Sequence, residues 1–300
     1  MGTGYNYPVV NTQVWTTRRL LACTARHLGA KGVESPRLAA EMLLGHVLGV
    51  PRLKLFMDPE RPASALERAT FRQLVERAGE HEPVDYLIGQ APFFSMMLTV
   101  SPAVLIPRPS TETIVEHVIQ HARRTPGFHS PLIFDIATGC GAMAVALAKH
   151  IPTSRIVATD ISEQALAVAG ENGREQNVAD RIDLVAGDLL DALPPNQRAA
   201  YLVSNPPYVS DDEWADVPLN VKDYEPHTAL RGGADGLKFI RKIIAGARTY
   251  LTRPAQLVLE IAASQKDQVL KLAQNTGGLT NAHILVDHES LPRVLVADAV

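Results

Sequence analysis

The stretch Ala200-Tyr201-Leu202-Val203-Ser204-Asn205-Pro206-Pro207-Tyr208 joins a short apolar run to two consecutive prolines. Residues 200–204 have the composition of a buried strand. Neither proline has a backbone N–H to donate, so the chain must leave the sheet at Asn205. Because open parallel sheets bind ligands at the carboxyl ends of their strands, the stretch predicts a ligand site containing an amide, two rigid rings and a phenol.

Strands and helices alternate around this stretch from residue 131 onward. Apolar runs predict strands at 132–136, 155–159, 182–186, 200–204 and 256–261. Helical periodicity predicts helices at 142–150, 163–176, 237–250 and 264–274. Two final strands, near 283–286 and 293–297, are too close together for a helix between them and predict an antiparallel hairpin at the sheet edge. The pattern is that of an α/β domain with a mostly parallel sheet covered on both faces.

The first part of the chain has a different pattern. Residues 1–11 are expected to be loosely ordered, and helical spacing follows at 12–27, 36–48 and 64–80. This predicts a small α-helical domain over residues 1–82. Three β-like runs, at 84–89, 93–100 and 104–109, predict a hairpin connector over residues 83–109. A helix at 111–123, capped near Ser110, then opens a second domain over residues 110–300.

The composition limits the classes of function. With 46% hydrophobic and 20% charged residues, the chain is that of a globular protein with a real core. A net charge of −3 argues against a protein that mainly grips a nucleic-acid backbone. The distant cysteines Cys23 and Cys140 fit a reducing compartment. No run approaches the roughly 18 apolar residues that span a bilayer, and residues 1–11 lack a secretory pattern, so we expect a cytoplasmic protein with no membrane partner.

A glycine-rich turn follows the first strand of the second domain, in Asp135-Ile136-Ala137-Thr138-Gly139-Cys140-Gly141-Ala142. Gly139 and Gly141 allow a tight turn and close approach of a ligand to the backbone. The turn lacks the third glycine of a dinucleotide fingerprint and the Lys-Ser/Thr pair of a P-loop, so pyrophosphate is a poor candidate ligand. A strand-to-helix turn with no ligand is the alternative.

Two acidic residues stand where later strands end. Asp160 can accept hydrogen bonds from both ribose hydroxyls of an adenosine, or it can cap the next helix together with Ser162. Asp188 can accept from an adenine amino group while Leu189 packs on the ring, or it can be a simple turn aspartate. The glycine turn and Asp160 together indicate a nucleoside-bearing cofactor without phosphates, which is S-adenosylmethionine.

Asn205 and its prolines suit an amide or amine substrate. The oxygen of Asn205 and the carbonyl of Pro206 can each accept one N–H from an NH2 group. Acceptors out of the amide plane favour a pyramidal nitrogen, whose lone pair is otherwise delocalised into the amide. Tyr208 can stack on a planar substrate beside Pro207. We therefore expect Asn205, Pro206 and Tyr208 to be catalytic; a plain Pro-Pro turn capped by Asn205 is the alternative.

Other polar residues are expected to have no catalytic role. His117 and His121 have helical spacing without a third ligand, which predicts an exposed helix face rather than a metal site. Residues 211–213 read as a solvated acidic loop. Glu260 ends a strand and either lines the site or caps the next loop. We expect no metal ion.

The chain resembles the protein-(glutamine-N5) methyltransferases that modify peptide chain release factors. The resemblance rests on Glu82-Pro83-Val84-Asp85-Tyr86-Leu87-Ile88-Gly89 with Phe93 or Phe94, Leu105-Ile106-Pro107-Arg108-Pro109-Ser110-Thr111-Glu112, residues 135–142, Asn205-Pro206-Pro207-Tyr208 and Tyr224-Glu225-Pro226-His227-Thr228-Ala229-Leu230. Asn-Pro-Pro-Tyr alone is shared with methyltransferases that act on the amines of DNA and RNA bases. The segments around Arg108 and Glu225 are the more specific ones.

The resemblance implies a helical domain that helps to recognise the partner, a β-hairpin and a Rossmann-like, seven-stranded class I methyltransferase domain. It implies that residues 205–208 hold the glutamine of a Gly-Gly-Gln loop. Cofactor contacts are implied at Asn205, Ala137, Thr138, Gly139, Cys140, Gly141, Asp160 and Leu189.

Three residues depart from the family pattern. Ala137 replaces a glycine and is expected to have a φ below zero. Ser110 replaces an acid, and Leu189 an aromatic residue of some relatives. The alternatives to release-factor methylation are an N6-adenine or N4-cytosine nucleic-acid methyltransferase, another glutamine substrate, and a cofactor-binding protein without catalysis.

Overall fold

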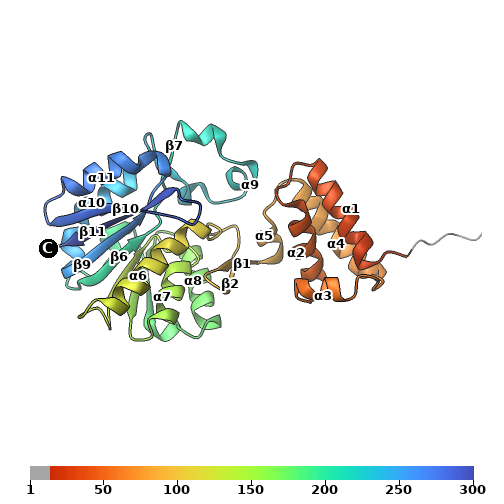
Figure 1. Cartoon of the computed structure of the whole chain (residues 1–300), viewed down its shortest axis with the longest axis horizontal. Coiled ribbons are helices and arrows are strands. Elements are labelled where there is room, and N and C mark those ends of the chain that lie inside the picture. Colours follow the sequence, from red (N-terminus) through yellow and green to blue (C-terminus); the bar gives the residue numbers. More distant parts are fainter. Residues whose placement is uncertain (1–13) are drawn as a thin grey trace, which may run out of the picture. The chain divides into compact units, whose positions relative to one another are not determined.

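The computed structural model describes residues 14–300, so the expectation for residues 1–11 lies outside the described residues. The chain forms two compact units, and the boundary between them in the sequence falls between Ile88 and Gly89 (Figure 1). Within the described part, we find no helix with the length and apolar character needed to cross a bilayer.

In its described residues, 14–88, the first unit consists of five helices. They are α1 (Thr17–Ala30), α2 (Pro36–Leu48), α3 (Arg52–Met57), α4 (Ala65–Gly79) and α5 (Val84–Ile88). Leu28, Leu43, Leu44 and Phe71 are among the residues that fill their common core. Helix α4 begins with a capping box, in which Ser64 accepts from the Glu67 backbone and the Glu67 side chain accepts from the Ser64 backbone. The sequence therefore predicted α1, α2 and α4 correctly.

The β-like reading of residues 84–89 is wrong, because Val84–Ile88 forms the short helix α5. The segment follows Pro83, whose fixed φ suits a helix start, and Tyr86 and Leu87 are buried. Adjacent apolar residues at a helix turn cannot be told from a short strand by periodicity alone.

The hairpin that the sequence predicted is present in the second unit. Strands β1 (Gln90–Phe93) and β2 (Met96–Thr99) pair antiparallel. Phe94 and Ser95 form the turn with φ of 48° and 61°, the positive values of a tight hairpin turn. The structure shows no strand at residues 104–109, where the third β-like run lies. Residues 105–108 have no regular secondary structure, and the short 3-10 helix η1 (Pro109–Thr111) begins directly after them.

A seven-stranded sheet forms the centre of the second unit (Figure 1). Its order is β10-β11-β9-β6-β3-β4-β5. The strands are β3 (Leu132–Ile136), β4 (Arg155–Asp160), β5 (Ile182–Ala186), β6 (Ala199–Ser204), β9 (Leu251–Glu260), β10 (Leu279–Val286) and β11 (Pro292–Ala299). The first five are parallel, while β11 runs antiparallel to β9 and to β10. The α/β fold and the closing antiparallel hairpin are thus confirmed.

Helices cover both faces of this sheet. They are α6 (Glu112–Arg124), α7 (Ala142–His150), α8 (Glu163–Glu175), α10 (Lys238–Tyr250) and α11 (Lys266–Gln274). Figure 1 shows α6, α7 and α8 on one side and α10 and α11 on the other. Ile240, Ile243 and Ile244 of α10 are fully or almost fully buried against the sheet.

The strand order determines where a ligand site can form in the sheet. Strand β3 pairs with β4 on one side and with β6 on the other. The chain therefore reverses its direction of progress across the sheet at β3, and such a switch point opens a crevice beyond the carboxyl ends of the strands. A long excursion follows β6, with the short paired strands β7 (Val209–Ser210) and β8 (Arg231–Gly233) and helix α9 (Leu219–Lys222).

Candidate active site

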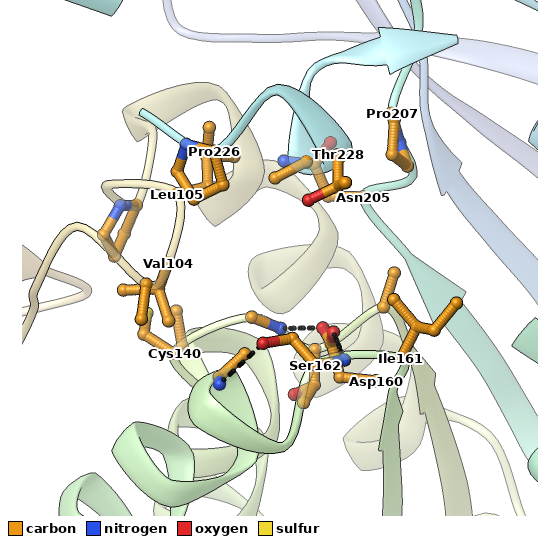
Figure 2. A pocket seen from close by; sticks show the side chains of 18 of the residues that line it. Val104, Leu105, Cys140, Asp160, Ile161, Ser162, Asn205, Pro207, Pro226 and Thr228 are labelled. Carbon is orange, nitrogen blue, oxygen red and sulfur yellow. Dashed lines mark hydrogen bonds between the residues drawn. The ribbon is translucent and has the colours of Figure 1, made fainter. Parts of the chain in front are cut away.

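A cavity of about 600 Å³ lies at the carboxyl ends of the parallel strands (Figure 2). The loops after β3, β4, β5 and β6 each contribute to its lining, and so do residues 102–105, 107, 108, 111 and 226–229. Of the residues expected to bind cofactor, those that line it are Ala137, Thr138, Gly139, Cys140, Asp160, Asp188, Leu189 and Asn205. The structure thus brings residues from four separate loops into one space.

The glycine turn after β3 exposes its backbone to this cavity. Gly139 has a φ of 58°, and a Cβ there would meet no atom within 4 Å. A side chain at this position would therefore occupy cavity space. Gly141 has a different role, because its Cβ would lie 2.9 Å from the Cβ of Ala169 in α8. Gly141 lets α8 pack closely against the turn rather than lining the cavity.

Ala137 has a φ of 56°, so the expectation of a negative φ is wrong. A left-handed conformation costs a non-glycine residue about 1–2 kcal/mol. Leu189 has a φ of 48° and lines the same cavity. Strained backbone of this kind persists where the surrounding structure fixes it, and it is concentrated at ligand sites.

Asp160 ends β4 and holds two loops together. One carboxylate oxygen accepts from the Gly139 backbone N–H and the other from the Ser162 backbone N–H, both at 2.9 Å. The Ser162 hydroxyl in turn caps α8 by accepting from the Ala165 backbone N–H at 3.2 Å. The position of Asp160 is thus compatible both with capping the next helix together with Ser162 and with binding a ribose, because each carboxylate oxygen can accept a second hydrogen bond.

Ile161 and Asp188 also line the cavity. Ile161 follows Asp160, lines the cavity and is 70% exposed, an unusual fraction for an isoleucine. Asp188 lies near the ammonium of Lys242 at 3.6 Å, and both side chains are about half exposed. The sequence signal for Ile161 is its place directly after Asp160 at the end of a strand.

Asp135 lies beneath the glycine turn and is fully buried. One of its oxygens accepts from the Thr138 hydroxyl at 2.6 Å and from the Ala144 backbone N–H at 3.1 Å. The other oxygen, Oδ1, has no hydrogen-bond partner. Burial raises the pKa of Asp135 to about 7, against the lowering effect of these two donors.

Asn205 follows β6 and lines the cavity (Figure 2). Its side-chain nitrogen donates to the Thr111 hydroxyl at 3.0 Å. The amide nitrogen is therefore engaged with the protein. The other end of the amide, Oδ1, is an acceptor, and we find no hydrogen bond to it within residues 14–300. An acceptor is what a substrate NH2 group requires.

Glu260, at the end of β9, accepts hydrogen bonds from three hydroxyl groups near Asn205. It is fully buried and accepts from Thr111 at 2.5 Å, Ser110 at 2.9 Å and Tyr208 at 3.4 Å. Burial raises the pKa of the Glu260 carboxyl, while the Thr111 and Ser110 hydroxyls and the nearby Arg293 guanidinium act in the opposite direction. Glu260 is thus not part of the cavity lining, and it contacts the site through the hydroxyl groups of Thr111, Ser110 and Tyr208.

Pro206 and Tyr208, two of the three expected catalytic residues, are not in the lining of the cavity. Pro207 lines it, whereas Pro206 is buried behind it. Tyr208 packs against the core of the sheet and directs its hydroxyl to Glu260. Its stacking on a substrate stays a prediction.

An ion pair joins the two other segments that line the cavity. The Arg108 guanidinium donates to Glu225 at 2.6 Å, and the Ile106 backbone N–H donates to the second Glu225 oxygen at 3.2 Å. The Glu225 side chain is only 1% exposed. Leu105 and Pro226, which flank these groups, both point into the cavity (Figure 2).

The residues expected to be uninvolved have mixed outcomes. His117 and His121 are half-buried, so the prediction of an exposed face is wrong. His117 hydrogen-bonds to Gln256 and His121 to Tyr201, and burial lowers the pKa of both rings. The strand residues that they meet come from far along the chain, which helical spacing cannot reveal. Among residues 14–300, no group of three His, Cys, Asp or Glu side chains could hold a metal ion.

Comparison with known proteins identifies the family. The "PrmC N-terminal domain" model matches residues 19–89 and the "Methyltransferase small domain" model matches residues 109–218. The release factor glutamine methyltransferase of Rhodopirellula baltica is 37% identical over 95% of this chain and 97% of its own length. The proteins of the same name from Geobacter sulfurreducens and Moorella thermoacetica are 38% and 39% identical, over 88% and 94% of this chain and 90% and 98% of theirs.

A solved methyltransferase structure from Pyrococcus furiosus aligns with 68% of this chain and 89% of its own chain, with a TM-score of 0.49 and 16% identity. The sequence relatives are the more informative, because they match both units over nearly their full length. The chain is an enzyme that belongs to the family of the release factor glutamine methyltransferases.

Proposed function

We propose that this enzyme transfers a methyl group from S-adenosylmethionine to the side-chain amide nitrogen of the glutamine in the Gly-Gly-Gln motif of peptide chain release factors. One observation carries the proposal. Asn205, with its acceptor oxygen, and the open backbone of Gly139 line the same cavity of about 600 Å³. The names of the relatives support the choice of substrate.

The residues around the cavity fit the cofactor. Its volume is within the range of small-molecule sites, about 300–1,000 Å³. Gly139 leaves space for close approach to the backbone, Asp160 offers spare acceptor sites to ribose hydroxyls, and Ile161 offers an exposed apolar surface to a base. We assign cofactor binding to Asn205, Ala137, Thr138, Gly139, Cys140, Gly141, Asp160, Asp188 and Leu189, with Gly141 acting through the packing of the turn.

S-adenosylmethionine supplies, when bound, an electrophilic methyl group on a sulfonium. The chain's own task is to prepare an amide nitrogen, which is a weak nucleophile because its lone pair is delocalised. Asn205 Oδ1 and the Pro206 carbonyl each accept one N–H of the substrate. Two acceptors out of the amide plane favour a pyramidal nitrogen, and Pro207 and Tyr208 limit its movement. The nitrogen loses a proton to solvent after it gains the methyl group.

We further propose how the chain divides its tasks. Residues 1–82 form the domain that recognises the release factor, residues 83–109 connect it, and residues 110–300 carry the methyl transfer. The net charge of −3 supports a protein partner rather than a stable nucleic-acid partner.

Mass spectrometry of release factors isolated from cells with and without this enzyme tests the proposal. We expect one additional methyl group on the Gly-Gly-Gln peptide only when the enzyme is present. An unchanged peptide mass would contradict the proposal. Labelling of DNA or RNA bases by the purified enzyme would instead favour a nucleic-acid methyltransferase with the same acceptor geometry.

A further inference from the structure

We infer that Thr111, held by Glu260, is the positioning residue that fixes the Asn205 amide with its oxygen toward the substrate. The inference rests on the proposed function, since the end of the amide that faces the cavity matters only if the substrate presents an NH2 group. It adds Thr111 and Glu260, to which the sequence assigned no catalytic role, to the residues on which methyl transfer depends.

The need for such a residue comes from the chemistry of Asn205 itself. A side-chain amide has a donor end and an acceptor end of almost the same shape. Rotation by half a turn about the last bond of the Asn205 side chain would place the NH2 group in the cavity. Two facing NH2 groups have no acceptor between them, so the substrate would lose its partner. A neighbouring residue must therefore fix which end of the Asn205 amide faces the cavity.

Thr111 can fix the orientation of the Asn205 amide because its hydroxyl carries only one proton. The hydroxyl donates to Glu260 Oε2 at 2.5 Å, a length typical of an O–H donor facing a carboxylate. Only its lone pairs then remain for Asn205, and they accept from the Asn205 nitrogen at 3.0 Å. The oxygen of Asn205 is excluded from this position because it has no proton to give.

Glu260 sets the direction of the whole chain of bonds. The Thr111 and Ser110 hydroxyls and the Arg293 guanidinium favour the ionised form of Glu260 and so oppose the effect of burial on its pKa. An ionised carboxylate accepts hydrogen bonds and donates none. The Ser110 and Tyr208 hydroxyls also donate to Glu260, through Oε1. Oε2 is thus left to Thr111. Glu260 is fully buried and Thr111 is only 5% exposed, so neither group readily exchanges this bond for one with water.

The three groups come from parts of the chain that the fold holds independently. Asn205 follows β6, Thr111 ends η1 and Glu260 ends β9, which pairs with β6 and with β11. The orientation of the Asn205 amide is therefore set by the sheet and by the segment that precedes α6, and substrate contact is not needed to create it.

Substitution of Thr111 tests the inference. Thr111→Val keeps the shape and removes the hydroxyl, whereas Thr111→Ser keeps the hydroxyl. Thr113→Val, two residues further along, is the matched control. With intact release factor and labelled S-adenosylmethionine, we expect Thr111→Val to lower kcat by about 10²-fold, since small losses of alignment have effects of that size. Thr111→Ser and Thr113→Val should remain within a few-fold of wild type, and the Kd of the cofactor should not change in these two variants.

Glu260→Gln provides a second variant with the same shape. A neutral amide can donate to Thr111 as well as accept from it, so the direction of the bonds is no longer fixed. We expect a kcat between those of wild type and Thr111→Val. Wild-type kcat in Thr111→Val would overturn the inference, and wild-type kcat in Glu260→Gln would overturn the part assigned to Glu260.

NMR of the Asn205 side-chain amide provides a readout that needs no turnover. We expect slow hydrogen exchange of this NH2 group in wild type and in Thr111→Ser, and fast exchange in Thr111→Val. If wild type methylates no glutamine, the proposed function fails and the exchange rates alone decide the inference. Equal exchange in wild type and Thr111→Val would overturn it.

Discussion

The guanidinium of Arg108 lies 2.6 Å from the carboxylate of Glu225, although 117 residues of chain separate them. Both residues belong to the two segments on which the resemblance to this family rests most specifically. The ion pair joins these segments, so each positions the other against the cavity. Glu225 also accepts from the Ile106 backbone, so it fixes the course of residues 105–108.

Breaking this pair should destabilise the second unit. Arg108→Met leaves the Glu225 carboxylate buried without its cation, and we expect a loss of about 2 kcal/mol in the free energy of unfolding. That is less than the roughly 3–5 kcal/mol of a fully buried pair, because the Arg108 side chain is 31% exposed. Adding Glu225→Gln to Arg108→Met should recover part of the loss in urea denaturation. Additive effects of the two substitutions would show that the residues are not coupled.

Asp135 should make the stability depend on pH. Its pKa in the folded protein, about 7, is above its ordinary value of 3.8. The folded protein therefore favours the protonated form of Asp135. The resulting contribution to the free energy of unfolding is fully present below about pH 4 and is lost as the pH rises through about 7. The slope reaches about 1.4 kcal/mol per pH unit for one proton. Asp135→Asn, measured by urea denaturation at several pH values, should flatten the profile in this window. The same slope in wild type and Asp135→Asn would contradict the assignment.

Ala137→Gly should leave the protein as stable as wild type or slightly more so. Glycine relieves about 1–2 kcal/mol of left-handed strain at a φ of 56° and loses about 0.4–1 kcal/mol through the greater freedom of the unfolded chain. Ala167→Gly, at an exposed position within α8, is the matched control and should lose about 1 kcal/mol. Thermal denaturation compares the two. An equal loss of Tm in both variants would mean that Ala137 is not strained.

Gly139→Ala should weaken cofactor binding more than it weakens the fold. The new methyl group would stand in the open space of the cavity, at a φ of 58°. Gly127→Ala, which has a φ of 91° and also meets no atom within 4 Å, shares the backbone cost but lies outside the cavity lining. Calorimetric titration with S-adenosylmethionine should show a Kd at least about 10-fold higher for Gly139→Ala only. Equal Kd values for the two variants would contradict the placement of the cofactor at this turn.

The alternating strands and helices of the second unit were predictable because their signals are local. β3 and α7 have the bounds that the sequence predicted, since each apolar run is closed by a polar or glycine turn. The helix α5 was not predictable in this way, because five residues are too few to distinguish the two periodicities. The segment before η1 has strand-like composition but no partner strand, and a partner is a property of the fold rather than of the segment.

The candidate site was predictable only in part, for a related reason. Residues that end or follow a strand, such as Gly139, Asp160 and Asn205, could be found from their position alone. Thr111 could not, because its importance comes from contacts with Asn205 and Glu260, which lie 94 and 149 residues away. The left-handed φ of Ala137 was likewise hidden, because alanine gives no sequence signal for that conformation.

Methyl transfer in vitro tests the central claim most directly. The enzyme is incubated with S-adenosylmethionine labelled in its methyl group and with release factor, either intact or with the Gly-Gly-Gln glutamine replaced by glutamate. The account predicts label on the intact factor, none on the glutamate form, and a rate lower by about 10²-fold for Asn205→Ala, the loss expected for one aligned polar group. Equal labelling of the intact factor and the glutamate form would contradict it.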